Sequence, residues 1–124
     1  MPTPHTLRLP QTRAAWHEQP AGALWPARLK REICALPVTA LPLQAALQYG
    51  DRAIGQPRSM LLLDHQVTAG ELQLRVGVFF ASVVSGCHCS DDPGPPETAT
   101  EYAELRLRLA LADEQAHCEV SLDA

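Results

Sequence analysis

The chain has 124 residues, of which 46% are hydrophobic, and its 10 Lys and Arg against 14 Asp and Glu give a net charge of −4. This length suits one modest hydrophobic core and excludes most multidomain architectures. The longest apolar stretch, 76–84, is about half of the roughly 18 residues that indicate a membrane-spanning helix, so we expect no membrane helix.

The N-terminal residues 1–24 contain four of the 11 prolines and show little apolar periodicity. This composition is typical of an extended, mobile arm. The first residues also lack the basic segment and apolar run of a secretory signal, which predicts a cytoplasmic protein. We therefore expect a flexible Pro-rich arm over 1–24 and a single α+β domain over 25–124.

Two helices are predicted after the arm. Apolar residues recur at helical spacing over about 26–36, until Pro37 ends the pattern. A second helix is expected over 40–49, with Gly50 at its end. Residues 51–57 are then predicted to form a connecting loop.

From residue 59 onward the apolar period becomes two, which predicts β-strands. We expect four strands, over about 59–67, 71–86, 101–112 and 115–123. Sequential strands most often pair with their chain neighbours. The predicted fold is therefore a small two-layer α+β domain, in which a four-stranded antiparallel meander carries two N-terminal helices on its apolar face.

Cross-strand pairs specify the register of two hairpins. With Ala69-Gly70 as the first loop, Asp64 faces Arg75. With Asp113-Glu114 as the second loop, Arg108 faces Glu119. The inward partners in these registers are Leu61 with Val78, Leu63 with Val76, His65 with Leu74, Val67 with Leu72, Leu105 with Leu122, Leu107 with Val120 and Leu109 with Cys118.

Charge is distributed unevenly along the chain. Residues 1–59 carry seven basic and three acidic side chains, a net charge of +4, whereas residues 60–124 carry three and eleven, a net charge of −8. Either a basic layer packs on an acidic layer, or the basic half meets an anionic partner such as RNA. Only Arg28, Lys30 and Arg31 cluster, with Trp25 nearby, and this pattern does not favour nucleic acid.

An unusually long connection follows the second predicted strand. The segment 86–96 is longer than the roughly 2–5 residues of most hairpin loops, and it contains two thiols, an imidazole and two carboxylates. Thiols two residues apart point the same way in an extended backbone and suit zinc or another soft divalent metal. The predicted metal ligands are Cys87, Cys89, Asp91, Asp92 and His117, with His88 as a further candidate if the backbone turns there.

The same segment has other interpretations. A Cys87–Cys89 disulfide would be strained and easily reduced, but the usual redox motif has two residues between its cysteines and lies at a helix start. A cysteine nucleophile needs a base held by a third group, and only His117 with Glu119 offers such a pair, so an enzyme is not favoured. In a purely structural interpretation the cysteines end a buried strand and the two aspartates turn the chain.

The second predicted strand is apolar on both faces, because Phe79, Ala81 and Val83 extend the apolar character to its other side. Such a strand needs cover on both sides, from the N-terminal arm or from another subunit. A β-bulge near Phe79 would instead remove the second patch. We expect a homodimer or partner interface here. The two functional hypotheses are therefore a metal-binding domain and a non-catalytic interaction module whose cysteines are structural.

Overall fold

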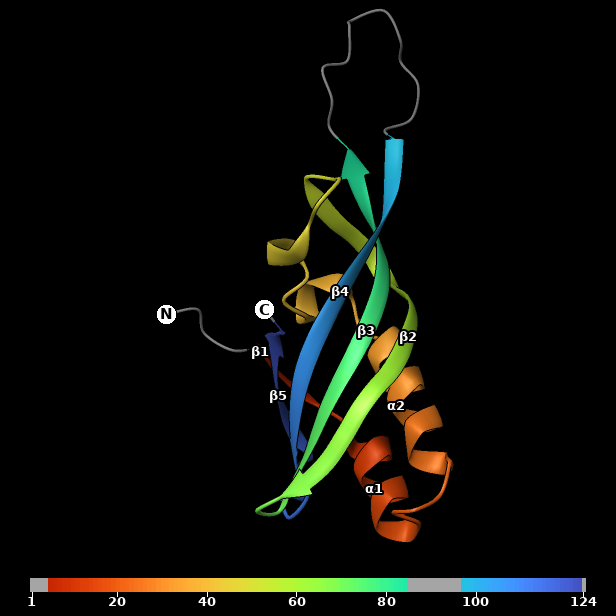
Figure 1. The fold of residues 1–124 in the computed structure, drawn as a ribbon, viewed down its shortest axis with the longest axis vertical. Coiled ribbons are helices and arrows are strands. Elements are labelled where there is room, and N and C mark those ends of the chain that lie inside the picture. The colour runs from red at the N-terminus through yellow and green to blue at the C-terminus, as the bar shows by residue number, and fades with distance from the viewer. Residues whose placement is uncertain (1–4, 85–96, 124) are drawn as a thin grey trace, which may run out of the picture.

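A five-stranded antiparallel sheet and two α-helices form the part of the chain that the computed structural model describes, residues 5–84 and 97–123. The strand order is β1-β5-β4-β3-β2, and both α-helices lie on the same side of the sheet (Figure 1). The predicted α+β class is therefore confirmed. The elements are β1 (His5–Arg8), α1 (Pro10–Glu18), α2 (Leu24–Cys34), β2 (Arg52–Thr68), β3 (Glu71–Val84), β4 (Glu97–Ala110) and β5 (His117–Leu122).

The predicted number of strands is wrong, because a fifth strand comes from the expected arm. Strands β2 to β5 are consecutive neighbours, as predicted, and β1 adds to the far edge by pairing antiparallel with β5. Leu7 of β1 lies opposite Cys118, and Leu9 just after it is fully buried. The described part of residues 1–24 is thus built into the fold and is not a flexible arm.

Helix α1 also belongs to the segment that was expected to be mobile. It begins at Pro10, a residue suited to the first turn because its missing N–H would have no helical partner there. Thr12 is buried, and both its backbone N–H and its hydroxyl donate to Glu32 Oε1 of α2, at 2.6 and 2.7 Å. Arg13 Nε donates to the carbonyl oxygen of Leu111 at 2.8 Å, which ties α1 to the end of β4.

Helix α2 agrees with the predicted helix over 26–36 to within two residues at each end. The second predicted helix, over 40–49, is wrong: this region forms only two short 3₁₀ turns, Val38–Ala40 and Gln44–Ala46. The cause is Pro42, because a residue before proline is pushed out of the helical region. Leu41 accordingly has an extended backbone, with φ −119° and ψ 154°.

Strand β2 begins at Arg52, so the loop predicted over 51–57 is largely strand. Its pairing with β3 is interrupted between Ile54 and Ser59. Gly55 there has φ +74°, and proline at position 57 cannot donate a ladder hydrogen bond. The strand signal was weak because this stretch contains both a glycine and a proline.

The register of the first hairpin is confirmed near its turn and shifts beyond it. Asp64 pairs with Arg75, and both turn residues, Ala69 and Gly70, have positive φ values of 52° and 77°, as the tight hairpin turn requires. A shift at Leu63 then changes the pairing. The predicted pairs of Leu61 with Val78 and Leu63 with Val76 are wrong, since Leu61 pairs with Gly77 and Leu62 with Val76.

The register of the second hairpin is confirmed throughout. Arg108 lies opposite Glu119, and the three predicted apolar pairs of β4 and β5 all form. The connection is longer than the predicted two residues, since β4 ends at Ala110 and β5 begins at His117. The core lies between the sheet and the helices, and its largest fully buried apolar side chains are Trp25, Phe80, Leu9, Leu29, Ile33, Leu41, Leu43, Leu72, Leu105, Leu107 and Leu109.

Candidate functional site

The face of the sheet turned away from α1 and α2 carries an aromatic pair. Phe79 of β3 lies opposite Tyr102 of β4, with ring centroids 4.8 Å apart and ring planes inclined by 46°. The Tyr102 ring also covers Gly77, where a Cβ would collide with the phenol. Beside them on β2, Leu61 is 49% exposed. We call Leu61, Phe79, Tyr102 and Val83 the outer-face strip.

Two of the three residues predicted for an interface are accessible. Phe79 and Val83 are half-buried, whereas Ala81 is only 6% exposed. The alternative was a bulge near Phe79 that would change which face β3 turns outward. The β2–β3 pairing does shift between Ile54 and Ser59, opposite Ala81 and Phe79, but β3 pairs with β4 without a shift and keeps its alternation. Within the described residues both α-helices lie on the opposite side of the sheet, so the outer-face strip has no helical cover (Figure 1).

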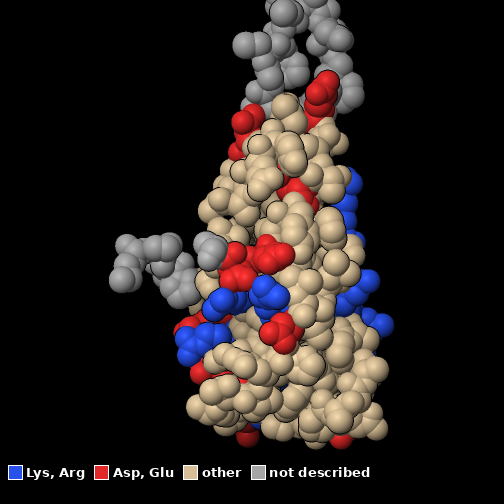
Figure 2. Space-filling view, in the orientation of Figure 1, with Lys and Arg blue, Asp and Glu red and all other residues tan. Residues whose placement is uncertain are grey.

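A band of charged side chains borders the strip. Arg75, Arg106 and Arg108 project from β3 and β4, and the carboxylates of Glu71, Glu104, Glu119 and Asp123 lie among them. We call these seven residues the charged band. Figure 2 shows blue and red side chains interspersed in one such band across the visible face, with a mainly tan surface above it.

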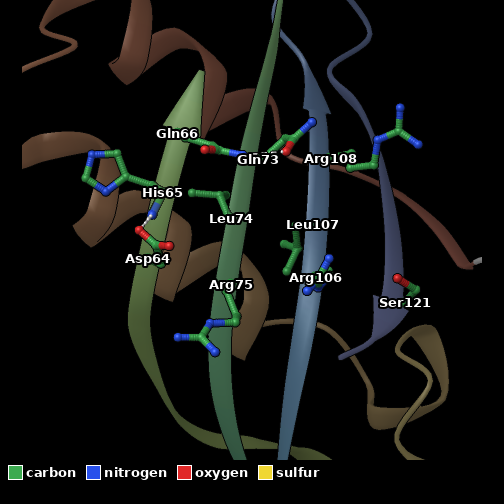
Figure 3. Close-up of a pocket in the computed structure, with 10 residues that line it drawn as sticks. All are labelled: Asp64, His65, Gln66, Gln73, Leu74, Arg75, Arg106, Leu107, Arg108 and Ser121. Carbon is green, nitrogen blue, oxygen red and sulfur yellow. Dashed lines mark hydrogen bonds between the residues drawn. The ribbon is translucent and has the colours of Figure 1, made fainter. Parts of the chain in front are cut away.

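A shallow depression of about 720 Å³ lies over the charged band. Its lining residues lie on β2, β3, β4 and β5, and Figure 3 shows His65 pointing away from the three arginines. His65 packs instead against Trp25 of α2, with ring centroids 5.1 Å apart. The residues that line the depression are Asp64, His65, Gln66, Gln73, Leu74, Arg75, Arg106, Leu107, Arg108 and Ser121.

The arginines of the depression already have carboxylate partners. Arg106 Nε lies 2.6 Å from an oxygen of Asp123, and Arg108 Nη2 lies 3.0 Å from an oxygen of Glu71. The hydrogen bond from Arg108 to Glu71 raises the pKa of the guanidinium further above its ordinary value. An anionic ligand would have to displace these carboxylates, so the depression is not a ready anion site.

The surroundings of Tyr102 keep its phenol protonated. Burial raises the pKa of its phenol, and the hydrogen bond that its hydroxyl donates to Glu104 Oε2, at 3.1 Å, raises it further. The phenol is therefore neutral at ordinary pH. Its ring can supply apolar contact area, while its hydroxyl remains bound to the charged band.

Most of the predicted metal ligands lie outside the described residues. This holds for Cys87, His88, Cys89, Asp91 and Asp92, so their convergence stays a prediction. Within 5–84 and 97–123, no group of three or more His, Cys, Asp or Glu side chains is placed to hold a metal ion. Elemental analysis of the purified protein and of its Cys89→Ser variant would test the metal hypothesis.

His117, the remaining predicted ligand, lies at the other end of the sheet. It begins β5 next to the residue pair Leu109–Cys118, whereas the segment 85–96 joins β4 at Glu97. The 12 residues of β4 from Glu97 to Arg108 span about 40 Å at roughly 3.3 Å per residue. His117 therefore lies far from Glu97, the end of β4 that follows the predicted metal-binding loop.

His117 and Glu119, the general base and orienting group considered for a cysteine nucleophile, do not pair with each other. His117 Nδ1 contacts Asp113 Oδ2 in the β4–β5 connection, and Glu119 is paired with Arg108. Cys118 is buried, and desolvation raises the pKa of its thiol to about 12. The described residues therefore give no activated thiol beside His117.

A buried carboxylate on β4, which the sequence analysis did not single out, accepts four hydrogen bonds. Glu101 is 1% exposed, and it accepts hydrogen bonds from the backbone N–H groups of Gln48, Tyr49 and Gly50 and from the Ser82 hydroxyl, at 2.7 to 3.0 Å. Burial alone raises the pKa of Glu101, but the four hydrogen bonds outweigh it and hold the pKa below its ordinary value.

The position of Glu101 in the strand pattern is the signal that could have revealed it. Ala103, Leu105, Leu107 and Leu109 alternate inward along β4, and Glu101 continues this series by one step. A lone carboxylate at an inward position must find hydrogen-bond donors in the fold. It holds residues 48–50 against the sheet and is a structural feature of the face opposite the outer-face strip.

Comparisons with known proteins give no further guide to this site. No helix among the described residues is both long and apolar enough to cross a membrane. The chain gives no significant match to a family model, to a curated protein or to a solved structure.

Proposed function

We propose that this chain is a non-catalytic interaction module, which forms a symmetric dimer by packing its outer-face strip against the same strip of a second copy. The observation that carries the proposal is the Phe79–Tyr102 pair beside Leu61, on the face of the sheet turned away from α1 and α2. Aromatic side chains in a partly exposed patch with a polar border are typical of interface centres.

The border of the strip supports a second copy as the partner. The charged band contains three arginines and four carboxylates in alternation, so it offers both signs of charge to an identical surface. An isologous interface requires such self-complementarity. A surface with a single sign of charge would repel its own copy.

The size of the interface requires the band as well as the strip. A stable interface buries about 800 Å² on each partner, and four partly exposed side chains supply less than this. We therefore place the strip at the centre of the interface and the charged band at its rim. In this arrangement the rim arginines keep their carboxylate partners, and the strip supplies the affinity.

Analytical ultracentrifugation tests the proposal. The unmodified chain is expected to sediment as a dimer, and Phe79→Asp as a monomer, because the charge would be buried at the centre of the interface. Gln11→Asp adds the same charge on exposed α1 and is expected to remain dimeric. Leu61→Asp gives a second test at a more exposed position, where folding is less affected.

The result can contradict the proposal in two ways. A wild-type chain that sediments as a monomer at every concentration excludes homodimerisation. A dimer that survives both Phe79→Asp and Leu61→Asp, with circular dichroism confirming that each variant is folded, places the interface elsewhere on the molecule.

A further inference from the structure

Strand β2 forms the edge of the sheet opposite β1, and it carries exposed apolar side chains among its polar ones. Within the described residues β2 pairs only with β3, so its other side is not part of a ladder. Five large hydrophobic side chains of the described chain are exposed, and three of them, Leu61, Leu63 and Val67, lie on β2. A long edge strand with exposed apolar side chains is a template for a further strand.

Helix α2 follows β2 beneath the sheet. At the start of the helix Trp25 packs on His65, and just after its end the carbonyl oxygen of Ala35 accepts a hydrogen bond from Gln56 Nε2 at 3.1 Å. The helix therefore lies alongside the strand from residue 65 back to residue 56. Side chains on the exposed side of α2 and those of β2 border the same edge.

Exposed basic side chains on α2 and β2 have no carboxylate partners among the described residues. Lys30 and Arg31 on α2 and Arg52 and Arg58 on β2 are all exposed, and none of the four makes an ion pair within the described residues. Blue side chains without red neighbours lie along the side of the molecule on which Figure 1 shows α2 and β2 (Figure 2). The edge therefore carries uncompensated positive charge, unlike the charged band.

We propose that β2 binds an extended acidic peptide segment as an additional strand of the sheet. The backbone of the segment pairs with β2 around 59–62, the regular stretch between its two register shifts. Its carboxylates meet Arg58 and the basic side chains of α2, and its apolar residues cover Leu61 and Leu63. This inference concerns the β2 edge, which shares Leu61 with the proposed dimer interface but does not include Phe79, Tyr102 or Val83.

The charges on β2 also predict where along the bound segment its acidic residues lie. Arg52 and Arg58 precede the regular stretch, and Asp64 follows it. Acidic residues of the segment are favoured beside the arginines and disfavoured beside Asp64. The other edge of the sheet is a poorer template, because β1 has only four residues.

Binding of designed peptides tests the inference. A labelled peptide of alternating valine and glutamate is expected to bind the intact chain, whereas the same peptide with lysine in place of glutamate is not. Charge reversal at the edge, Lys30→Glu with Arg58→Glu, is expected to weaken binding by about tenfold or more. Arg8→Glu reverses an exposed charge on the distant strand β1 and is expected to leave the affinity unchanged.

Backbone amide NMR shifts distinguish this site from others. Shifts induced by the acidic peptide are expected at residues 59–62 and must persist in Phe79→Asp, so loss of the dimer and loss of peptide binding are separate results. Equal binding of the lysine peptide, shifts confined to other strands, or tight binding of polyuridylate RNA with no binding of the acidic peptide would each overturn the inference. If the double variant does not fold, Arg58→Glu alone provides the charge test.

Discussion

Glu101 shows how a charge is tolerated inside this small core. Its carboxylate has no arginine or lysine partner among the described residues, and backbone N–H groups and one hydroxyl provide its hydrogen bonds. A buried charge is acceptable when its acceptor capacity is met in this way. Gly50 is required at the site, since a Cβ there would collide with Ser82.

Replacing Glu101 by Gln should lower the free energy of unfolding by about 2–3 kcal/mol, because the amide keeps the shape but turns a donor toward backbone donors. Denaturant unfolding measures this loss. Glu97→Gln, at an exposed position of the same strand, is the control and should change little. Equal stability of the two variants would show that the carboxylate is not needed.

The same residue predicts an acid-sensitive stability. The pKa of Glu101 is lowered by folding, so its contribution is present above the ordinary carboxyl pKa of 4.5 and is lost as the pH falls through the lower folded value. Wild-type stability should therefore decrease in acid more steeply than that of Glu101→Gln. Denaturant unfolding curves measured at successive pH values test this. If the free energies of unfolding of the wild type and of Glu101→Gln fall in parallel with pH, the linkage is absent.

Cys118 should be inert in the folded protein. Burial raises the pKa of its thiol to about 12, so almost none is present as thiolate near neutral pH. Site-resolved mass spectrometry after alkylation should find Cys118 unmodified until denaturant is added, and Cys34 modified before Cys118, since Cys34 is only half-buried. Rapid native modification of Cys118 would show that β5 separates from its neighbours in the folded protein.

Strand β1 and helix α1 complete the core. Leu9 between them is fully buried, and its backbone N–H donates to the Ala116 carbonyl oxygen at 3.0 Å. Leu9→Ala should therefore cost about 2–4 kcal/mol of stability in denaturant unfolding, as deletions of buried leucine side chains do. Thr6→Ala, at an exposed position of β1, is the matched control. An equal loss of stability in both variants would indicate that the N-terminal segment does not pack on the core.

The strands that could be predicted from the sequence are those whose residues specify a cross-strand pairing. The hairpin registers followed from opposite charges at Asp64 and Arg75 and at Arg108 and Glu119, because a slip of one residue would invert every side chain. Strand β1 could not be found this way, since four residues with one inward leucine show no periodicity. The bulge at Leu63 was also hidden, because leucine fits either face of a strand.

The candidate surfaces were predictable only in part. Phe79 and Val83 stood out as apolar residues at outward positions, and the structure leaves both partly accessible. The pairing of Phe79 with Tyr102 depended on the β3–β4 register, which the long connection between these strands left unspecified. The basic edge required the position of α2 relative to β2, a long-range relation that local periodicity does not contain.

The sheet and the helical layer that packs on it should unfold together. Arg13 links α1 to Leu111 at the end of β4, and Glu101 links residues 48–50 to the middle of the sheet. Circular dichroism at the strand and helix bands and fluorescence of Trp16 and Trp25 should give coincident transitions, as in a two-state unfolding reaction. Separate midpoints would show that the helical layer melts independently.

The pairing of β1 with β5 has a consequence for biosynthesis. His5 lies opposite Val120, so the first described strand to leave the ribosome finds its partner only after residues 117–122 have been translated. Such non-local contacts form late, because a long loop must close before they stabilise the fold. Until then Leu7 and Leu9 have no sheet edge to cover, and the nascent chain exposes them to chaperones and to other chains.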